Sequence, residues 1–336
     1  MMRNTLTFAI FILVVTGLFI CNILFGAVKI DPANVFRALF DSGTADDINR
    51  YILLDNRLPT AVTALLSGAG LGCAGLLLQT VFRNPLAGPS ILGISSGASL
   101  GVAIVTLFFT SSISIADLEW SGKGAVIAGS FFGSFMILGL LIIAAMRLRN
   151  NLTLLIFGMM IGYLSSSIVS LLTSTSTASG IQNFAIWGLG TFSGIGRESL
   201  GGFAICITIG LAGSLFLAKP LNLLLLGDNY ARNLGVNVNR IRNLLLIVSG
   251  VLTAVITAYC GPIAFIGLAI PHIARLFLHT HNHWSLLPAV MLLGGMVCLL
   301  CNLMSVTLSS TVVPINALTP IIGVPVIIYV ILRRKS

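Results

Sequence analysis

Ten long apolar stretches, none with an acidic or basic side chain near its middle, constrain this sequence more than any other feature. A bilayer core of about 30 Å is crossed by roughly 20 apolar residues in a helix, which also satisfies its own backbone hydrogen bonds in lipid. The composition agrees, because 57% of the residues are hydrophobic, 8% are charged and the mean hydropathy is +1.05. The sequence therefore predicts an all-α polytopic membrane protein with about ten transmembrane helices in a single domain, residues 1–336. The predicted spans are 6–25, 58–80, 93–112, 124–146, 152–172, 200–217, 243–259, 263–277, 284–306 and 315–332.

Two apolar stretches require separate interpretation. The first span, 6–25, follows Arg3 closely, as the apolar part of a secretory signal would, but no small-residue cleavage motif follows it. We therefore expect it to be retained as a first transmembrane helix. The stretch 181–196 is short and rich in glycine, which favours a partly inserted or surface helix over an eleventh crossing.

The lysines and arginines predict the orientation of these spans. Ten crossings place both termini on one side, and cytoplasmic termini put 12 basic residues inside and 6 outside, as the positive-inside rule requires. The inner set is Arg3, Arg83, Arg147, Arg149, Lys219, Arg232, Arg240, Arg242, Arg275, Arg333, Arg334 and Lys335, and the outer set is Lys29, Arg37, Arg50, Arg57, Lys123 and Arg197. Among the acids only Asp228 falls inside. The net charge of +9 is thus a topology signal, and no nucleic-acid partner is expected because the basic residues are scattered over many loops.

Several classes of function are disfavoured by what the sequence lacks. Ion-coupled transporters usually keep ionisable side chains at membrane depth, and the middles of these spans contain none. No G-x-x-x-x-G-K-[ST] motif is present, so the chain has no P-loop for ATP and any active transport must draw energy from another subunit. The six cysteines lie in or beside apolar segments and imply neither disulfides nor a metal site. His279, His281 and His283 are interpreted as surface residues, since no thiolate or carboxylate completes a metal-ligand set.

Two stretches interrupt their spans with glycine and proline. Residues 82–101 contain Pro85 and Pro89, and residues 261–275 contain Pro262 and Pro271. Broken backbone at membrane depth is tolerated where it is buried in protein or lines a water-filled cavity, so both stretches are candidates for a transport path or its gate. From composition alone, kinks that only shape helix packing explain them equally well. Paired glycines four residues apart (68 and 72, 97 and 101, 129 and 133, 190 and 194) are expected to be packing faces.

Four blocks in this order resemble the FecCD-type permeases, the membrane subunits of type II ABC importers for iron-siderophore, haem and cobalamin. They are RLPTAVTALLSGAGLGCAGLLLQTVFRNPLAGPSILGISSGASLG (57–101), LNLLLLGDNYARNLGVNVNR (221–240), GPIAFIGLAIPHIARL (261–276) and PINALTPIIGVPVIIYVILRR (314–334). The resemblance covers nearly all of the chain after residue 50. It implies a multi-pass protein of the bacterial inner membrane that forms a homodimer with the path at its interface. It also implies two cytoplasmic ABC ATPase subunits as partners and one periplasmic or surface-tethered substrate-binding protein.

The resemblance also implies roles for particular residues. In the inner coupling loop, 218–242, the residues that receive the movement of the ATPase would be Leu226, Gly227, Asp228, Ala231, Leu234 and Gly235. Asn84 and Leu86 match positions that close the inner end of the path, and Arg57 matches a docking position for the binding protein next to the outer segment, 27–56. The sequence departs from the family at Thr60, where many members have a second arginine, and this puts docking by a full arginine set in doubt.

The main hypothesis is therefore a transport subunit without a catalytic site or cofactor, which moves a bulky metal chelate through a weakly polar path. An ATP-independent secondary transporter or channel for a small solute is the competing hypothesis. An intramembrane enzyme is a third, which lacks a polar catalytic cluster within the spans.

Overall fold

The computed structural model describes residues 2–28, 30, 31, 35, 47–109, 121–148, 150–308 and 312–333, and every regular element among them is helical. Among these described residues, seven helices are long and apolar enough to cross a membrane, and three shorter apolar helices lie at the remaining predicted spans. Each of the ten predicted spans thus coincides with a helix. The ten are α1 (Met2–Leu24), α4 (Leu58–Phe82), α5 (Ile94–Ala103), α6 (Ser121–Arg147), α7 (Asn151–Ser174), α9 (Arg197–Phe216), α12 (Val238–Cys260), α13 (Ile266–Leu278), α14 (His283–Thr307) and α15 (Ile315–Arg333).

Shorter elements join these helices at the two ends of the bundle. At one end, α3 (Asp47–Tyr51) runs through a π-helical turn, η1 (Ile52–Arg57), directly into α4, and a second π-helical turn, η2 (Ile104–Phe109), extends α5. A short helix, α8 (Ala178–Leu189), occupies the apolar stretch that the sequence assigned to a surface or partly inserted helix. At the other end, α10 (Ala218–Leu225) and α11 (Asp228–Asn233) form the inner loop.

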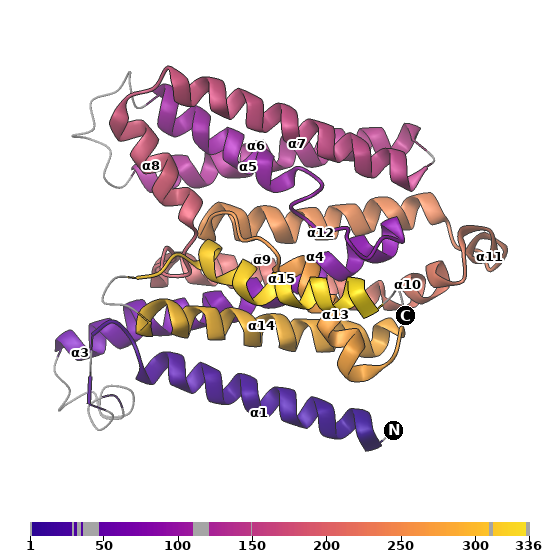
Figure 1. The fold of residues 1–336 in the computed structure, drawn as a ribbon, viewed down its shortest axis with the longest axis horizontal. Helices are drawn as coiled ribbons and strands as arrows, with labels where there is room; N and C mark the ends of the chain where they lie inside the picture. The colour runs from indigo at the N-terminus through magenta and orange to yellow at the C-terminus, as the bar shows by residue number, and fades with distance from the viewer. Residues whose placement is uncertain are drawn as a thin grey trace.

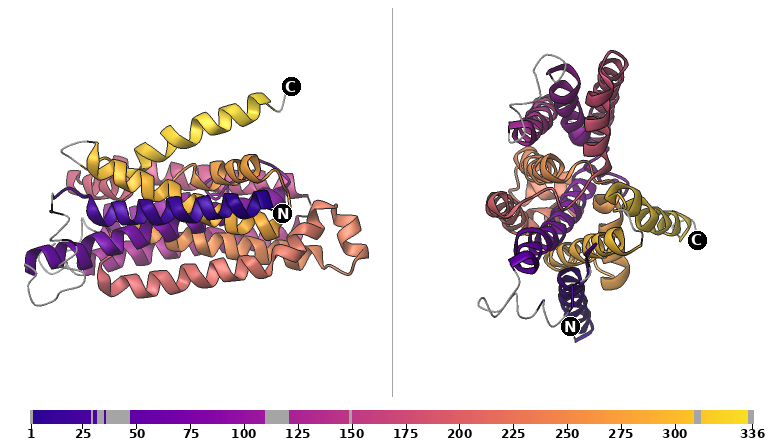
Figure 2. Two further views of the ribbon diagram at one scale, coloured as in Figure 1. Left: turned by 90° about the horizontal axis from the view of Figure 1, so that it is seen from below. Right: turned by 90° about the vertical axis from the view of Figure 1, so that its left-hand side faces the viewer.

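The long helices run side by side, with α1 at one edge and α5, α6 and α7 at the other (Figure 1). The most buried helix is α4, which packs against α12, α13 and α14 in the middle of the bundle. The start of α1, the end of α15 and the helix α11 all lie at the same end of the molecule (Figure 1). Toward its C-terminal end α15 stands out from the bundle, as both views in Figure 2 show.

Glycines allow the central helices to approach one another closely. A Cβ on Gly75 of α4 would lie 1.6 Å from the carbonyl oxygen of Gly267 in α13, and one on Gly68 would lie 2.1 Å from that of Gly294 in α14. The predicted pairs on α5 and α6 face each other, because a Cβ on Gly101 would lie 1.9 Å from the carbonyl oxygen of Gly129. Van der Waals packing of this kind replaces the hydrophobic driving force that lipid cannot supply. The prediction for residues 190 and 194 was wrong, since both lie in the connection between α8 and α9.

The helix bounds differ from the predicted spans chiefly at the inner loop. Helix α12 begins five residues before the predicted span 243–259, because the side chain of Asn237 accepts a hydrogen bond from the backbone N–H of Arg240 and so caps its start. The apolar run could not show this, since polar residues form the first turn. Part of the outer segment 27–56 falls outside the described residues, as do Lys29, Arg37, Asp41, Asp46, Asp117, Glu119, Arg149, Arg334 and Lys335.

Candidate functional site

The inner loop is built as two short helices separated by glycines. Gly227 has a φ of 109° and Gly235 a φ of 84°, in the left-handed region that glycine adopts without steric strain. A Cβ at either position would meet no atom within 4 Å, so the backbone conformation, and not crowding, favours glycine there. Between them, Ala231 is fully buried and holds α11 against the bundle.

Large apolar side chains project from this loop. Leu226 is 60% exposed and Leu234 is 53% exposed, and Tyr230 between them is also exposed. They lie on or next to α11, which extends beyond the ends of the long helices in Figure 1. Apolar side chains gathered on a surface of this kind are typical of a site where another protein binds. We call Leu226, Tyr230 and Leu234 the loop patch.

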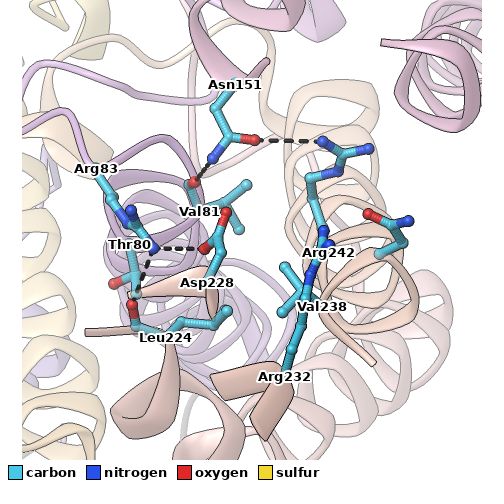
Figure 3. A pocket seen from close by; sticks show the side chains of 10 residues that line it. Thr80, Val81, Arg83, Asn151, Leu224, Asp228, Arg232, Val238 and Arg242 are labelled. Carbon is cyan, nitrogen blue, oxygen red and sulfur yellow. Dashed lines mark hydrogen bonds and ion pairs between the residues drawn. The ribbon is translucent and has the colours of Figure 1, made fainter. Parts of the chain in front are cut away.

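An ion pair ties α11 to the end of α4. The guanidinium of Arg83 donates a hydrogen bond to the carboxylate of Asp228, the first residue of α11. The same nitrogen lies 3.4 Å from the carbonyl oxygen of Leu224, near the end of α10 (Figure 3). Arg83, the residue that follows α4, is therefore hydrogen-bonded to both short helices of the inner loop.

The segment after α4, residues 83–93, carries the two predicted gate residues. The Oδ1 of Asn84 accepts a hydrogen bond from the backbone N–H of Leu86 at 2.9 Å, which fixes the turn after Arg83. Leu86 is 41% exposed, although the alanine and glycine that follow it are buried. The segment ends at Gly93, whose φ is 80° and where a Cβ would lie 2.8 Å from the carbonyl oxygen of Gly158 in α7. We call residues 83–93 the gate segment.

The second broken stretch packs against the gate segment. His272 of α13 has its Nε2 2.8 Å from the carbonyl oxygen of Pro85, so this ring nitrogen is the donor. Gln79, near the end of α4, donates a hydrogen bond to the carbonyl oxygen of Leu268 at 3.2 Å and accepts one from Arg275 at 2.8 Å. The two stretches that proline and glycine interrupt thus form one hydrogen-bonded unit around the end of α4.

Arg57 lies away from the surface that its predicted docking role requires. Its side chain is 7% exposed and donates hydrogen bonds to the carbonyl oxygens of Ile23, Leu24 and Val28. The acceptors are at and just beyond the end of α1, where a helix leaves its last carbonyls without intrahelical partners. Arg57 therefore caps α1 in this structure, and its burial argues against a direct contact with a binding protein.

One face of α7 is polar and exposed. Tyr163, Ser166, Ser167, Ser170 and Ser174 follow the three- and four-residue spacing of a helix face, and all are exposed. The hydroxyl groups of Ser166, Ser167 and Ser170 each donate to the carbonyl oxygen four residues earlier at 3.0 Å. Lipid is a poor surrounding for such a face, so it indicates a water-filled space or another subunit beside α7.

Sequence reasoning assigned no individual role to Arg83, His272, Asn151 or Arg242. Arg242 is buried and donates to Asn151 and to the carbonyl oxygen of Ala145, while Asn151 donates to the carbonyl oxygen of Val81 at 2.8 Å. One signal was available for Arg83. Asp228 is the one acid assigned to the inner side, so a basic partner for it is expected among the inner arginines, of which Arg83 is one.

Comparison with known proteins gives the same family for almost the whole chain. The model of the FecCD transport family matches residues 12–333. The hemin transport system permease protein of Yersinia pestis is 33% identical, covering 99% of this chain and 97% of its own. The molybdate import system permease protein of Haemophilus influenzae is also 33% identical, covering 96% and 94%.

The fold agrees with a solved structure as well. A chain described as an inward-facing conformation of a metal-chelate type ABC transporter superposes with a TM-score of 0.81 at 31% identity. The superposition covers 98% of this chain and 99% of that one. Together with the helical bundle, the broken segments and the inner loop, these similarities show that the chain belongs to the FecCD transport family of ABC importer permeases.

Proposed function

We propose that this chain carries an iron-siderophore, haem or cobalamin-type metal chelate across the cytoplasmic membrane, driven by separate ATPase subunits. The Yersinia pestis hemin permease and the metal-chelate transporter support a chelate as cargo, whereas the Haemophilus influenzae permease is named for an oxyanion. The chain itself has no P-loop, so the hydrolysis of ATP falls to its partners.

The ion pair between Arg83 and Asp228 is the observation on which the mechanism rests. The loop patch offers an apolar surface to an ATPase, and Asp228 lies on the same short helix as Tyr230. When the ATPase moves α11, Arg83 transmits the displacement to Asn84 and Leu86, the next residues of the gate segment. Because His272 binds the carbonyl of Pro85, the second broken stretch moves with the gate segment.

The assembly we propose is a homodimer with its path between the two copies. The polar face of α7 supplies a weakly polar wall for that path, and the side of α15 that stands out from the bundle is available to a second copy. Two ABC ATPases bind at the inner loops. In this assembly the start of α1 and the end of α15 face the cytoplasm together with α11, and their position at the same end of the bundle supports this orientation.

One substrate-binding protein docks at the opposite end of the homodimer. Arg57 lies near this end but is buried, and its side chain binds the end of α1. Among the described residues, Arg50, Lys123 and Arg197 are exposed cations assigned to that end, and the side chain of Arg197 lies 3.8 Å from that of Asp55.

Transport by the reconstituted importer tests the proposal. The chain is placed in proteoliposomes with its ATPase and binding protein, and uptake of haem, a ferric hydroxamate, cobalamin and molybdate is compared. We expect uptake of one of the three chelates that requires ATP and the ATPase subunit. Uptake that a proton or sodium gradient drives without the ATPase would instead identify a secondary transporter, and uptake of molybdate alone would refute the chelate assignment.

A further inference from the structure

A cavity of about 230 Å³ opens between the inner loop and the inner ends of three long helices. It is lined by side chains at the end of α4, the start of α7, the start of α12 and the helix α11. Figure 3 shows Arg83, Arg232, Arg242, Asp228 and Asn151 around it. The cavity is smaller than sites for drug-sized ligands, which occupy about 300–1,000 Å³, and suits a single compact group.

The charge of the lining favours an anion. Three arginines and one aspartate line the cavity, which leaves an excess of two positive charges. Asp228 is already engaged by Arg83. The hydrogen bonds of Arg242 to Asn151 and to the carbonyl oxygen of Ala145 hold its guanidinium in place at the cavity without neutralising its charge.

The depth of the cavity relative to the membrane favours a lipid as the source of the anion. Asn151 and Val238 are the first residues of α7 and α12, and Val81 is one residue before the end of α4. All three therefore lie where apolar spans end, which is the level of the phospholipid phosphates. Basic pockets between helices at this level are known sites for anionic headgroups.

We propose that this cavity is a phosphate-binding site, and that it is occupied by the headgroup of an anionic phospholipid such as phosphatidylglycerol. Guanidinium groups bind phosphate oxygens through paired, charge-assisted hydrogen bonds, and the amide of Asn239, which also lines the cavity, adds a neutral donor. A phosphate bound between Arg232 and Arg242 joins α11, which the ATPase moves in the proposed mechanism, to the long helix α12. The lipid is thus a structural partner of the inner loop, independent of the cargo.

Lipid retention by the full chain, measured by native mass spectrometry, tests the site without any transport activity. The chain is purified in neutral detergent and equilibrated with phosphatidylglycerol or phosphatidylcholine. We expect phosphatidylglycerol to be retained in preference. Arg232→Gln should weaken its binding about fivefold, since one arginine near the surface contributes about that factor. Asp228→Asn should strengthen binding by a similar factor, because the competing carboxylate is removed.

Arg240→Gln is the matched control, since Arg240 is an exposed arginine on the same helix as Arg242 but outside the cavity lining. Equal loss of lipid in Arg232→Gln and Arg240→Gln would overturn the proposal, as would equal retention of the two lipids. Inorganic phosphate serves as a further probe. If it raises the melting temperature of the wild type but not of Arg232→Gln, while neither lipid is preferred, the phosphate site stands and its source is a free anion.

Discussion

Arg83 and Asp228 illustrate how a contact of small energy can decide a mechanism. Both side chains are substantially exposed, and exposed ion pairs contribute only about 0 to 1 kcal/mol to stability. The pair therefore contributes little to the folding of the chain. Its importance lies in its position, because it joins Asp228 of the inner loop to Arg83, the first residue of the gate segment.

Reversing the two charges separates the effect of the ion pair on transport from its effect on stability. We expect Arg83→Asp and Asp228→Arg each to lower ATP-driven uptake at least tenfold while ATP hydrolysis continues, since each places like charges together at the junction. The double variant should recover most of the uptake because the pair is restored with opposite polarity. The melting temperatures of all three should stay close to that of the wild type, in line with the small energy of an exposed pair.

Arg147→Asp provides the comparison, because it reverses an exposed inner charge at the end of α6 outside the cavity. It should leave the ratio of uptake to hydrolysis unchanged. Failure of the double variant to recover, with both single variants folded, would show that the pair does not transmit movement.

At the scale of helices, the crossing of α4 and α13 at Gly75 and Gly267 leaves the least room for an added methyl group among the described glycines. A methyl group on Gly75 would lie 1.6 Å from a backbone oxygen, so α13 would have to move away. Because α13 carries His272, which binds the gate segment, the displacement would reach the candidate site.

Gly75→Ala is therefore expected to destabilise the chain by about 1–3 kcal/mol or more, the usual cost of overpacking. The thermal melting of the detergent-purified chain measures it. Gly139→Ala is the matched substitution in a membrane helix, at a site where a Cβ would meet no atom within 4 Å. Equal melting temperatures for the two variants would contradict the close crossing.

The helices themselves were largely predictable, and the reasons are visible in particular segments. Apolar runs bounded by charges or turn residues identify α6, α7 and α14 to within a few residues, because lipid exposure demands such runs. The start of α12 was not predictable from hydropathy, since its first turn is capped by Asn237 and two of its first five residues are arginines. The burial of Arg57 was also missed, because a pattern cannot show that the end of α1 lies within reach of its guanidinium.

At the scale of the whole molecule, the exposed surface of the bundle differs in chemistry from one side to another. The polar face of α7 contains four serines, whereas the exposed residues of α9 include Ile205 and Ile209. In a membrane these two surfaces need different surroundings. The difference agrees with a homodimer whose path runs beside α7 and with lipid beside α9.

Thiol labelling distinguishes the two surfaces. In a Cys206→Ser background, which removes the exposed native thiol, we expect a membrane-impermeant reagent to modify Ser170→Cys in the assembled importer. Ile209→Cys should resist the same reagent because it lies against lipid tails. Labelling at Ile209→Cys with protection at Ser170→Cys would place lipid at α7 and contradict the proposed path.

The capping of α1 by Arg57 has a consequence for biogenesis. The first helix emerges from the ribosome more than thirty residues before the side chain that binds the carbonyls of Ile23 and Leu24. Until then, only water or the insertion machinery can donate hydrogen bonds to the last carbonyl groups of α1. The end of α1 therefore reaches its final hydrogen-bonded state only after Arg57, at the start of α4, has been synthesised.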